Sequence, residues 1–362
     1  MSAPEPRPGI MGITPYVPGM SRLDDHRTVI KLSSNEGALG PSPKAIEAYV
    51  NTARTLHRYP DGSSNDLREA IGARHGLDSD RIVCGAGSDE VLYLLGRSYA
   101  GPGDEIMFHE HAFIMYWLIA LGIGATPVKA AEIDLTAHVD TMLDAVSERT
   151  RVVFIANPNN PTGSYIPTDE LKRLRAGLRE DILLVIDSAY AEYITRNDYS
   201  AGAELVDAGD NTVMTRTFSK AYALGGVRLG WAYCPQEMAD VLNRVRGPFN
   251  VSLPAQAAGI AALEDASFLA VSRDHNSAWL PWMSERIGAT GLTVYPSVAN
   301  FVLVRFPDDD GHNAAAAIAF LNERGIIPRE TVANGLPGCI RISIGTEAEN
   351  RAVAAALAEF MT

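Results

Sequence analysis

The chain offers few amines that could do chemistry, and one of them has an unusual setting. Only five of the 31 basic residues are lysine: Lys31, Lys44, Lys129, Lys172 and Lys220. Lys220 stands just beyond a predicted strand end, close in sequence to Phe218, Tyr222 and a pair of glycines. A lysine in a partly apolar pocket with a cation nearby has a lowered pKa and becomes a usable amine for Schiff-base chemistry. A single loop lysine is more often simply solvated, so this interpretation depends on its neighbours.

Two polar side chains follow predicted strand ends in the same way. Asp187 comes directly after the apolar run at 182–186, and Asn160 lies in Asn-Pro-Asn-Asn-Pro-Thr-Gly, after the strand that ends at Ala156. Ligands of open α/β sheets bind at the carboxyl ends of the strands, so both side chains are candidates for a site. Taken alone, each segment is equally well explained as a turn, because Asn, Asp, Pro and Gly are residues that turns prefer.

A phosphate could bind where glycines join a predicted strand to a predicted helix. The segment Cys84-Gly-Ala-Gly-Ser-Asp-Glu90 leaves the amides of Ser88 and Asp89 free at the positive end of the helix. A short glycine-rich turn is weak evidence alone, and the dinucleotide pattern G-x-G-x-x-G is not met here. Ser219 and Arg228 flank Lys220 and could supply a hydroxyl and a guanidinium to the same phosphate. An amine, a carboxylate and an anion cradle together indicate pyridoxal phosphate.

The length, composition and charge of the chain limit the classes of protein to which it can belong. The chain has 362 residues, 46% of them hydrophobic, which can fill a sizeable core. Acidic residues outnumber basic ones by 44 to 31, and the net charge of −13 argues against binding to nucleic acid or anionic lipid. Three scattered cysteines without metal-ligand spacing fit a reducing compartment and predict no metal site. The N-terminus lacks a secretory pattern and the longest apolar run, 114–125, is too short to span a bilayer, so we predict a cytoplasmic protein.

The order of elements predicts an α/β fold. Seven short runs rich in β-branched residues are predicted strands: 81–84, 105–108, 126–129, 151–156, 182–186, 212–216 and 229–234. Predicted helices at 89–99, 112–121, 139–146 and 168–178 separate them. Strands that alternate with helices form a mostly parallel sheet, here of seven strands, with helices on both faces.

After Pro254 the pattern becomes α+β. We predict one long helix at 256–288, strands at 293–295, 301–305 and 339–343, and helices at 314–324 and 347–360. The first forty residues are punctuated by proline and glycine and look like an arm. The sequence therefore predicts an N-terminal arm (1–40), a large domain (41–255) and a smaller α+β domain (256–362).

Several motifs occur in an order that resembles one known family. Ala156–Gly163, Asp187–Tyr190 and Thr217–Arg228 are similar to segments of the fold-type I pyridoxal-phosphate aminotransferases. Further matches narrow the resemblance to the histidinol-phosphate aminotransferase family: Ile13–Gly19, Lys31–Glu36, Leu39–Lys44, Arg58–Ser64, Gly85–Glu90, Arg244–Asn250 and Ile340–Thr346. The resemblance extends from about residue 13 to the C-terminus and implies a fold-type I transferase with pyridoxal 5'-phosphate as its cofactor.

The resemblance also implies catalytic and cofactor-binding roles. Lys220 would hold the cofactor as a Schiff base and later shuttle a proton, and Asp187 would keep the pyridine nitrogen protonated. Asn160 and Tyr190 would hydrogen-bond the 3-oxygen of the ring, and Phe113 would stack on its face. The phosphate would be bound by four residues: Ser88, Asp89, Ser219 and Arg228.

Substrate residues and a dimer follow from the same resemblance. Arg341 would recognise the α-carboxylate, Arg329 would help to hold the substrate phosphate, and Asn35 would lie near the substrate. Tyr59, as a cofactor residue, and Tyr16, as a substrate residue, would reach the site of the neighbouring subunit. The implied unit is therefore a homodimer with shared active sites, in which the arm contributes to the small domain and to the dimer contacts.

The predicted reaction is amino transfer between histidinol phosphate and 2-oxoglutarate, in histidine biosynthesis. An aromatic-amino-acid aminotransferase is the close alternative, because imidazole and phenyl rings fill similar space. Threonine-phosphate decarboxylases share the fold and its phosphate-recognising arginines, and a non-catalytic binding protein is a further alternative. Two segments depart from the family pattern, Gly37-Ala38 after Asn35 and Thr331–Asn334 after Arg329, and both concern substrate choice rather than the cofactor.

Overall fold

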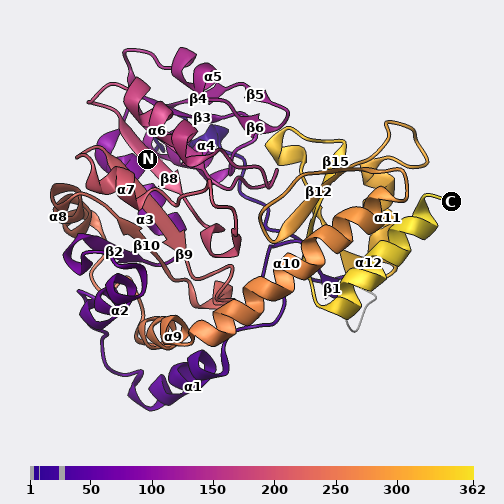
Figure 1. The fold of residues 1–362 in the computed structure, drawn as a ribbon. Coiled ribbons are helices and arrows are strands. Elements are labelled where there is room, and N and C mark those ends of the chain that lie inside the picture. Colours follow the sequence, from indigo (N-terminus) through magenta and orange to yellow (C-terminus); the bar gives the residue numbers. More distant parts are fainter. Residues whose placement is uncertain (1–3, 8, 24–28) are drawn as a thin grey trace.

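The molecule has a large part built on a seven-stranded sheet and a smaller part built on a four-stranded sheet (Figure 1). The structure is a computed structural model that describes residues 4–7, 9–23 and 29–362. No helix in the described part of the chain is long and apolar enough to cross a bilayer.

The large sheet confirms the predicted seven strands. They are β2 (Ile82–Gly85), β3 (Glu105–His109), β4 (Thr126–Ala130), β7 (Thr150–Ala156), β8 (Leu183–Asp187), β9 (Thr212–Thr217) and β10 (Gly230–Tyr233). Their order is β2-β10-β9-β8-β7-β3-β4, and only β10 runs antiparallel to its neighbours. The carboxyl ends of the other strands therefore meet along one edge of the sheet, where ligands bind in such folds.

Helices cover both faces of this sheet because its central strands are apolar on both sides. In β7, Val152 and Phe154 join the core beneath α3 (Ser88–Tyr99), α4 (Met115–Ile123) and α8 (Gln236–Val245). Val153 and Ile155 point the other way, toward α5 (Val139–Asp144), α6 (Thr168–Gly177) and α7 (Ala203–Asp207). Strand side chains alternate between faces, so a run without polar positions must be covered twice.

The smaller part packs three helices on its sheet. The sheet has the antiparallel order β11-β12-β15-β14, and its strands are β11 (Thr293–Tyr295), β12 (Phe301–Arg305), β15 (Cys339–Ser343) and β14 (Arg329–Glu330). The helices are α10 (Ala266–Gly288), α11 (Ala314–Glu323) and α12 (Glu347–Phe360), which contribute Met283, Leu321 and Leu357 to a shared core.

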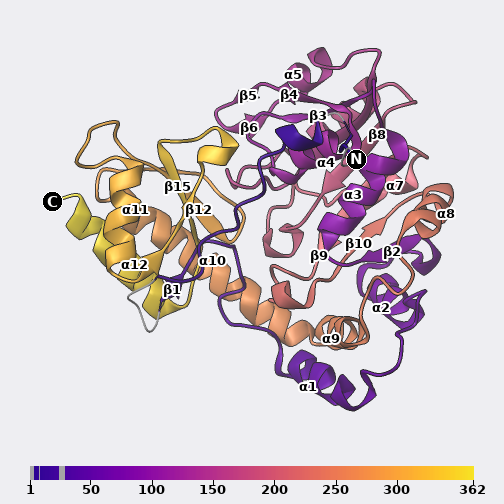
Figure 2. The same ribbon diagram turned by 180° about the vertical axis from the view of Figure 1, so that it is seen from behind.

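The N-terminal segment joins both parts. Its strand β1 (Ile30–Lys31) pairs in parallel with β13 (Ile326–Ile327) of the smaller part. Nearer the terminus, Arg7 donates to the carbonyl of Gly122 in α4, with a nitrogen–oxygen distance of 2.6 Å. Figure 2 shows this indigo segment passing between the two parts. The N-terminal arm thus contacts both the large and the smaller part.

The prediction of one helix over 256–288 is wrong. The chain forms two helices, α9 (Leu253–Glu264) and α10, which meet at Asp265, where φ is −91° and ψ is 61°. Helix α9 packs on α1 (Pro43–Asn51) and α2 (Asn65–His75), in the core of the large part. These contacts place α9 against the helices of the large part. The helices α1, α2, α7 and α8 and the short hairpin of β5 (Glu132–Ile133) and β6 (Thr136–Ala137) were not located from sequence.

A buried ion pair sits beneath the carboxyl edge of the large sheet. Arg216 of β9 donates to Glu192 with a nitrogen–oxygen distance of 2.8 Å, and the two side chains are 12% and 4% exposed. The guanidinium also lies 5.9 Å from the ring centre of Trp231. A charge so enclosed depends on its partner, because water cannot replace it.

We expect Glu192→Ala to lower the free energy of unfolding by about 3–5 kcal/mol, because it leaves the Arg216 charge buried and uncompensated. Urea-induced unfolding of the cofactor-free protein measures this. The double variant Arg216→Met/Glu192→Leu removes both charges and should recover most of the loss. A loss below about 1 kcal/mol in the single variant, as for an exposed pair, would contradict this account of the pair.

Candidate active site

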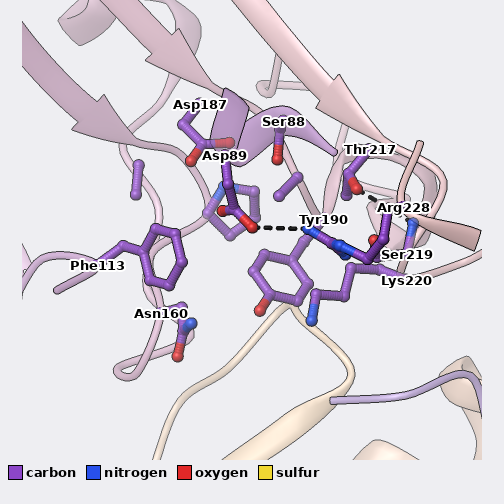
Figure 3. Close-up of a pocket in the computed structure, with 13 residues that line it drawn as sticks. Ser88, Asp89, Phe113, Asn160, Asp187, Tyr190, Thr217, Ser219, Lys220 and Arg228 are labelled. Carbon is purple, nitrogen blue, oxygen red and sulfur yellow. Dashed lines mark hydrogen bonds and ion pairs between the residues drawn. The ribbon is translucent and has the colours of Figure 1, made fainter. Parts of the chain in front are cut away.

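One pocket gathers nearly all the residues predicted to hold the cofactor (Figure 3). It is lined by Ser88, Asp89, Phe113, Asn160, Asp187, Tyr190, Thr217, Ser219, Lys220 and Arg228, together with Ala156, Pro158 and Ala189. Of the predicted catalytic and cofactor residues only Tyr59 is missing from this lining. Segments that are far apart in sequence meet here because each follows a strand end at the same sheet edge.

Asp187 is the last residue of β8 and is 4% exposed. Its Oδ2 accepts a hydrogen bond from the Tyr116 hydroxyl at 2.8 Å, and Thr215 Oγ1 lies 3.4 Å from Oδ1. Burial raises the pKa of Asp187 to about 6, and the hydrogen bond from Tyr116 opposes this rise. The carboxylate is therefore ionised at neutral pH but lacks a cationic partner among the described residues, which suits it to bind a protonated ring nitrogen.

The sequence did not point to Tyr116 or Thr215. Tyr116 is fully buried in α4 and stacks on Phe154, with ring centres 4.7 Å apart. In the sequence, Tyr116 is indistinguishable from the other apolar residues of a buried helix. Only the folded structure brings its hydroxyl to Asp187, which lies 71 positions further along the chain.

The Lys220 amine is enclosed beside the pocket. Its Nζ donates to the carbonyl of Ser34 at 3.2 Å and lies 5.8 Å from the ring centre of Tyr190. Burial, with a further contribution from the positive charge of Arg341, lowers the pKa of Lys220 to about 8. A sizeable fraction of the amine is thus uncharged near neutral pH, which is the state that attacks a carbonyl carbon.

The first turn of α3 forms an anion cradle. Helix α3 begins at Ser88, so the amides of Ser88 and Asp89 have no partner within the helix. Arg228 lies across from them, with φ at 58°, and donates to Asp89 at 2.8 Å (Figure 3). Two glycines keep the space open: a Cβ on Gly87 would clash with the Arg228 guanidinium, and one on Gly230 would clash with the backbone nitrogen of Ser88.

A second polar network joins the pocket to the smaller part. Arg341 of β15 donates to the side-chain oxygen of Asn160 and, at 2.6 Å, to the carbonyl of Ser33. Asn35, which is 1% exposed, donates to the Tyr190 hydroxyl at 2.9 Å and is itself bonded to Ser343. The predicted substrate residues Arg341 and Asn35 therefore touch predicted cofactor residues.

Two arginines face each other beside this network. Arg329 of β14 is the direct cross-strand partner of Arg341, and such partners lie on one face of a sheet. Burial, and to a lesser degree the charge of Arg329, lower the pKa of Arg341 to about 10. The Arg341 Nε is buried without a hydrogen-bond partner in the described structure. Like charges held this close favour an anionic ligand between them.

Tyr16 and Tyr59 lie outside the pocket of their own chain. Tyr16 is 51% exposed, and its ring centre is 5.8 Å from the Arg329 guanidinium carbon. Tyr59 is 81% exposed and stacks on Phe249, with ring centres 4.6 Å apart. Both rings are thus exposed enough to contact another molecule.

Comparisons with known proteins agree with the fold. A family model for aminotransferases of class I and II matches residues 27–357. A histidinol-phosphate aminotransferase of Paramagnetospirillum magneticum is 61% identical over 100% of this chain and 99% of its own length, and that of Rhodospirillum rubrum is 56% identical over 99% and 97%. The histidinol-phosphate aminotransferase of Sinorhizobium meliloti, solved in complex with pyridoxal-5'-phosphate, superposes with a TM-score of 0.87 at 29% identity over 92% of each chain.

Fold and pocket thus define an aminotransferase of class I and II. More distantly, aspartate aminotransferase from Thermus thermophilus shares the fold, with a TM-score of 0.82 at 21% identity over 92% of each chain. Within the class, the chain belongs to the histidinol-phosphate aminotransferase family.

The pocket residues fit pyridoxal phosphate. The cradle of α3 offers free amides and the Arg228 guanidinium to a phosphate, and Asp187 offers a buried negative charge to a ring nitrogen. Lys220 offers an amine whose pKa is lowered to about 8. Among residues 4–7, 9–23 and 29–362, no group of three His, Cys, Asp or Glu is arranged to hold a metal ion.

We expect Tyr116→Phe to shift the acid limb of the pH–rate profile upward by about one pH unit. The lost hydrogen bond stabilises the charged form of Asp187, so its removal raises the pKa of that carboxyl group. Tyr165→Phe is the matched control, since it removes a hydroxyl that bonds Asp198 at 2.9 Å, away from the pocket. An unchanged acid limb in Tyr116→Phe would show that this hydrogen bond does not tune Asp187.

Gly230→Ala should weaken binding of pyridoxal phosphate about tenfold or more, because the new methyl group pushes the Ser88 amide out of the cradle. Titration of the cofactor-free protein, followed by absorbance, gives the dissociation constant. In the control Gly226→Ala, the added methyl group meets no atom within 4 Å. Equal dissociation constants for the two variants would refute the role of the cradle.

Proposed function

We propose that this chain uses pyridoxal 5'-phosphate to transfer the amino group of histidinol phosphate to 2-oxoglutarate, a step of histidine biosynthesis. One observation carries the proposal: the Lys220 amine, the Asp187 carboxylate and the α3 cradle face one pocket beside a pair of arginines. Relatives that are 61% and 56% identical over nearly the whole chain are histidinol-phosphate aminotransferases.

Bound in this pocket, pyridoxal phosphate supplies a reactive carbonyl carbon and a ring that withdraws electrons from the substrate. Lys220 would hold the cofactor through its amine and, once free, would take up and return a proton at Nζ. Asp187 holds a proton on the ring nitrogen by its negative charge, and Tyr116 keeps that carboxylate oriented. Phe113 lines the pocket and would border the ring on one side.

The arginines explain how one site can serve two substrates in turn. Histidinol phosphate carries a phosphate, and 2-oxoglutarate carries two carboxylates. A planar guanidinium binds both kinds of anion with paired hydrogen bonds. Arg341 is buried and donates to Asn160, whereas Arg329 is more exposed and, within residues 4–7, 9–23 and 29–362, donates only to the carbonyl of Val17 at 3.1 Å. We assign the fixed Arg341 to the anion that each substrate presents in turn, the α-carboxylate of 2-oxoglutarate or the phosphate of histidinol phosphate, and Arg329 to a further contact with the phosphate.

We also propose a homodimer in the cytoplasm. Tyr16 and Tyr59 leave the pocket of their own chain uncovered, so a second copy would supply these rings. The exposed apolar residues Tyr49, Val50 and Leu56 lie on the same N-terminal region and would be buried by such contact. The three cysteines are buried free thiols, which fits a reducing compartment.

The first test is the half-reaction. Histidinol phosphate added to the yellow holoprotein without a keto acid should bleach its visible absorbance, and Lys220→Ala should lose turnover by orders of magnitude. Faster bleaching with phenylalanine would indicate an aromatic-amino-acid aminotransferase instead. Release of carbon dioxide from threonine phosphate would change the reaction class, and near-normal turnover in Lys220→Ala would refute the assignment.

Covalent attachment of pyridoxal phosphate to the cofactor-free protein should depend on pH through Lys220. Only the uncharged amine reacts, so the rate should rise nearly tenfold per pH unit below pH about 8 and level off above it. Stopped-flow absorbance measures this rate. A rate that keeps rising to pH about 10.4, the ordinary lysine value, would show that the pocket does not lower the pKa of Lys220.

A further inference from the structure

Hydrogen bonds tie the segment before Phe113 to the loop after Arg329. His111 Nδ1 lies 2.7 Å from the carbonyl oxygen of Asn334, and Asn334 Nδ2 donates to the carbonyl of Ala112 at 3.2 Å. A carbonyl oxygen can only accept, so Nδ1 must carry the imidazole proton. Both bonds join residues more than 220 positions apart, one in the large part and one in the smaller part.

In the large part, hydrogen bonds with neighbouring residues fix the backbone of His111. Glu132 Oε1 accepts from the His111 backbone amide at 3.0 Å and lies 2.6 Å from Nδ1 of the fully buried His109. Asn159, the neighbour of Asn160, donates to the His111 carbonyl at 3.1 Å. Backbone and side chain of His111 are thus both engaged, two residues before the ring that lines the cofactor pocket.

The smaller-part side is equally constrained. Thr331 is fully buried, and its one hydroxyl proton is shared between the carbonyl oxygens of Leu336 and Cys339, which lie 2.7 and 2.8 Å from Oγ1. This contact closes the loop onto the start of β15. Gly335 approaches the His111 ring closely: a Cβ there would stand 3.4 Å from it, and its φ is +79°. In Figure 1 the yellow turn before β15 lies beside the large part.

We propose that His111 and Asn334 are positioning residues that latch the two parts together and fix Phe113 relative to Arg329. This inference rests on the proposed function, because Phe113 limits the cofactor ring and Arg329 binds the anionic end of the substrate. The segment Thr331–Asn334, which departs from the family pattern, thereby contributes to the site. Asn334 connects the strand of Arg329 to the segment that carries Phe113. Loss of the latch loosens Phe113 relative to Arg329, although the bond of Arg341 to Asn160 still joins the two parts.

The variants His111→Ala and Asn334→Ala each remove one side-chain half of the latch. We expect amide hydrogen exchange at residues 110–114 to accelerate about fivefold, the effect of one net hydrogen bond, in the cofactor-free protein as well as in the holoprotein. In the holoprotein the Michaelis constant for histidinol phosphate should rise about fivefold, with a smaller change in kcat, and the visible circular dichroism of the bound cofactor should change.

Matched controls separate a latch from a general loss of structure. His275→Ala removes an imidazole bond to the carbonyl of Gly345 at 2.8 Å within the smaller part, and Asn211→Ala removes an amide bond to the carbonyl of Glu180 at 3.1 Å within the large part. Neither should change exchange at 110–114 or the Michaelis constant. His111→Asn places an amide nitrogen near the position of Nδ1 and should restore both toward the wild-type values.

Two results would overturn the latch. One is exchange at 110–114 that stays at the wild-type rate in both His111→Ala and Asn334→Ala. The other is an equal change in the controls His275→Ala and Asn211→Ala. Failure of the wild-type protein to transfer an amino group would refute the proposed function instead, and the exchange data would still decide whether the latch exists.

Discussion

An ionised carboxylate buried at the end of a parallel strand is the constraint on which this site depends. Asp187 is almost fully enclosed, and burial of such a charge is costly unless a cation meets it. Tyr116 and Thr215 reduce this cost with polar contacts, but neither carries a positive charge. A protonated pyridine nitrogen is the missing partner in the proposed function, so cofactor binding and stabilisation of Asp187 become one event.

Much of this arrangement could be predicted from the sequence because it is local or periodic. Most strands of the large sheet are short apolar or β-branched runs bounded by turn residues, and Asp187, Asn160 and Lys220 lie at or just beyond the ends of three of them. Tyr116 could not be found, because its hydroxyl acquires its role only when α4 packs beside β8. The break at Asp265 was missed for a related reason: residues 256–288 are helical almost throughout, and only the packing of α9 on α1 and α2 separates them.

Substrate recognition depends on contacts between the two parts, which sequence alone does not place. Arg341 reaches across to Asn160, and Asn35 of the arm reaches Tyr190. The latch of His111 and Asn334 adds a third crossing point beside the cofactor pocket. In the proposed function, the arginines that would bind the substrate anions therefore stand on a frame fixed to the residues that would hold the cofactor, as amino transfer between two different anions requires.

The most direct test of the central claim is the protonation state of the ring nitrogen. Pyridoxal phosphate labelled with ¹⁵N in the ring, bound to the wild-type protein and to Asp187→Ala, can be observed by NMR near neutral pH. The account predicts the chemical shift of a protonated nitrogen in the wild-type protein and of an unprotonated one in the variant. An unprotonated nitrogen in the wild-type protein, or the same shift in both, would contradict the assignment of Asp187 as its partner.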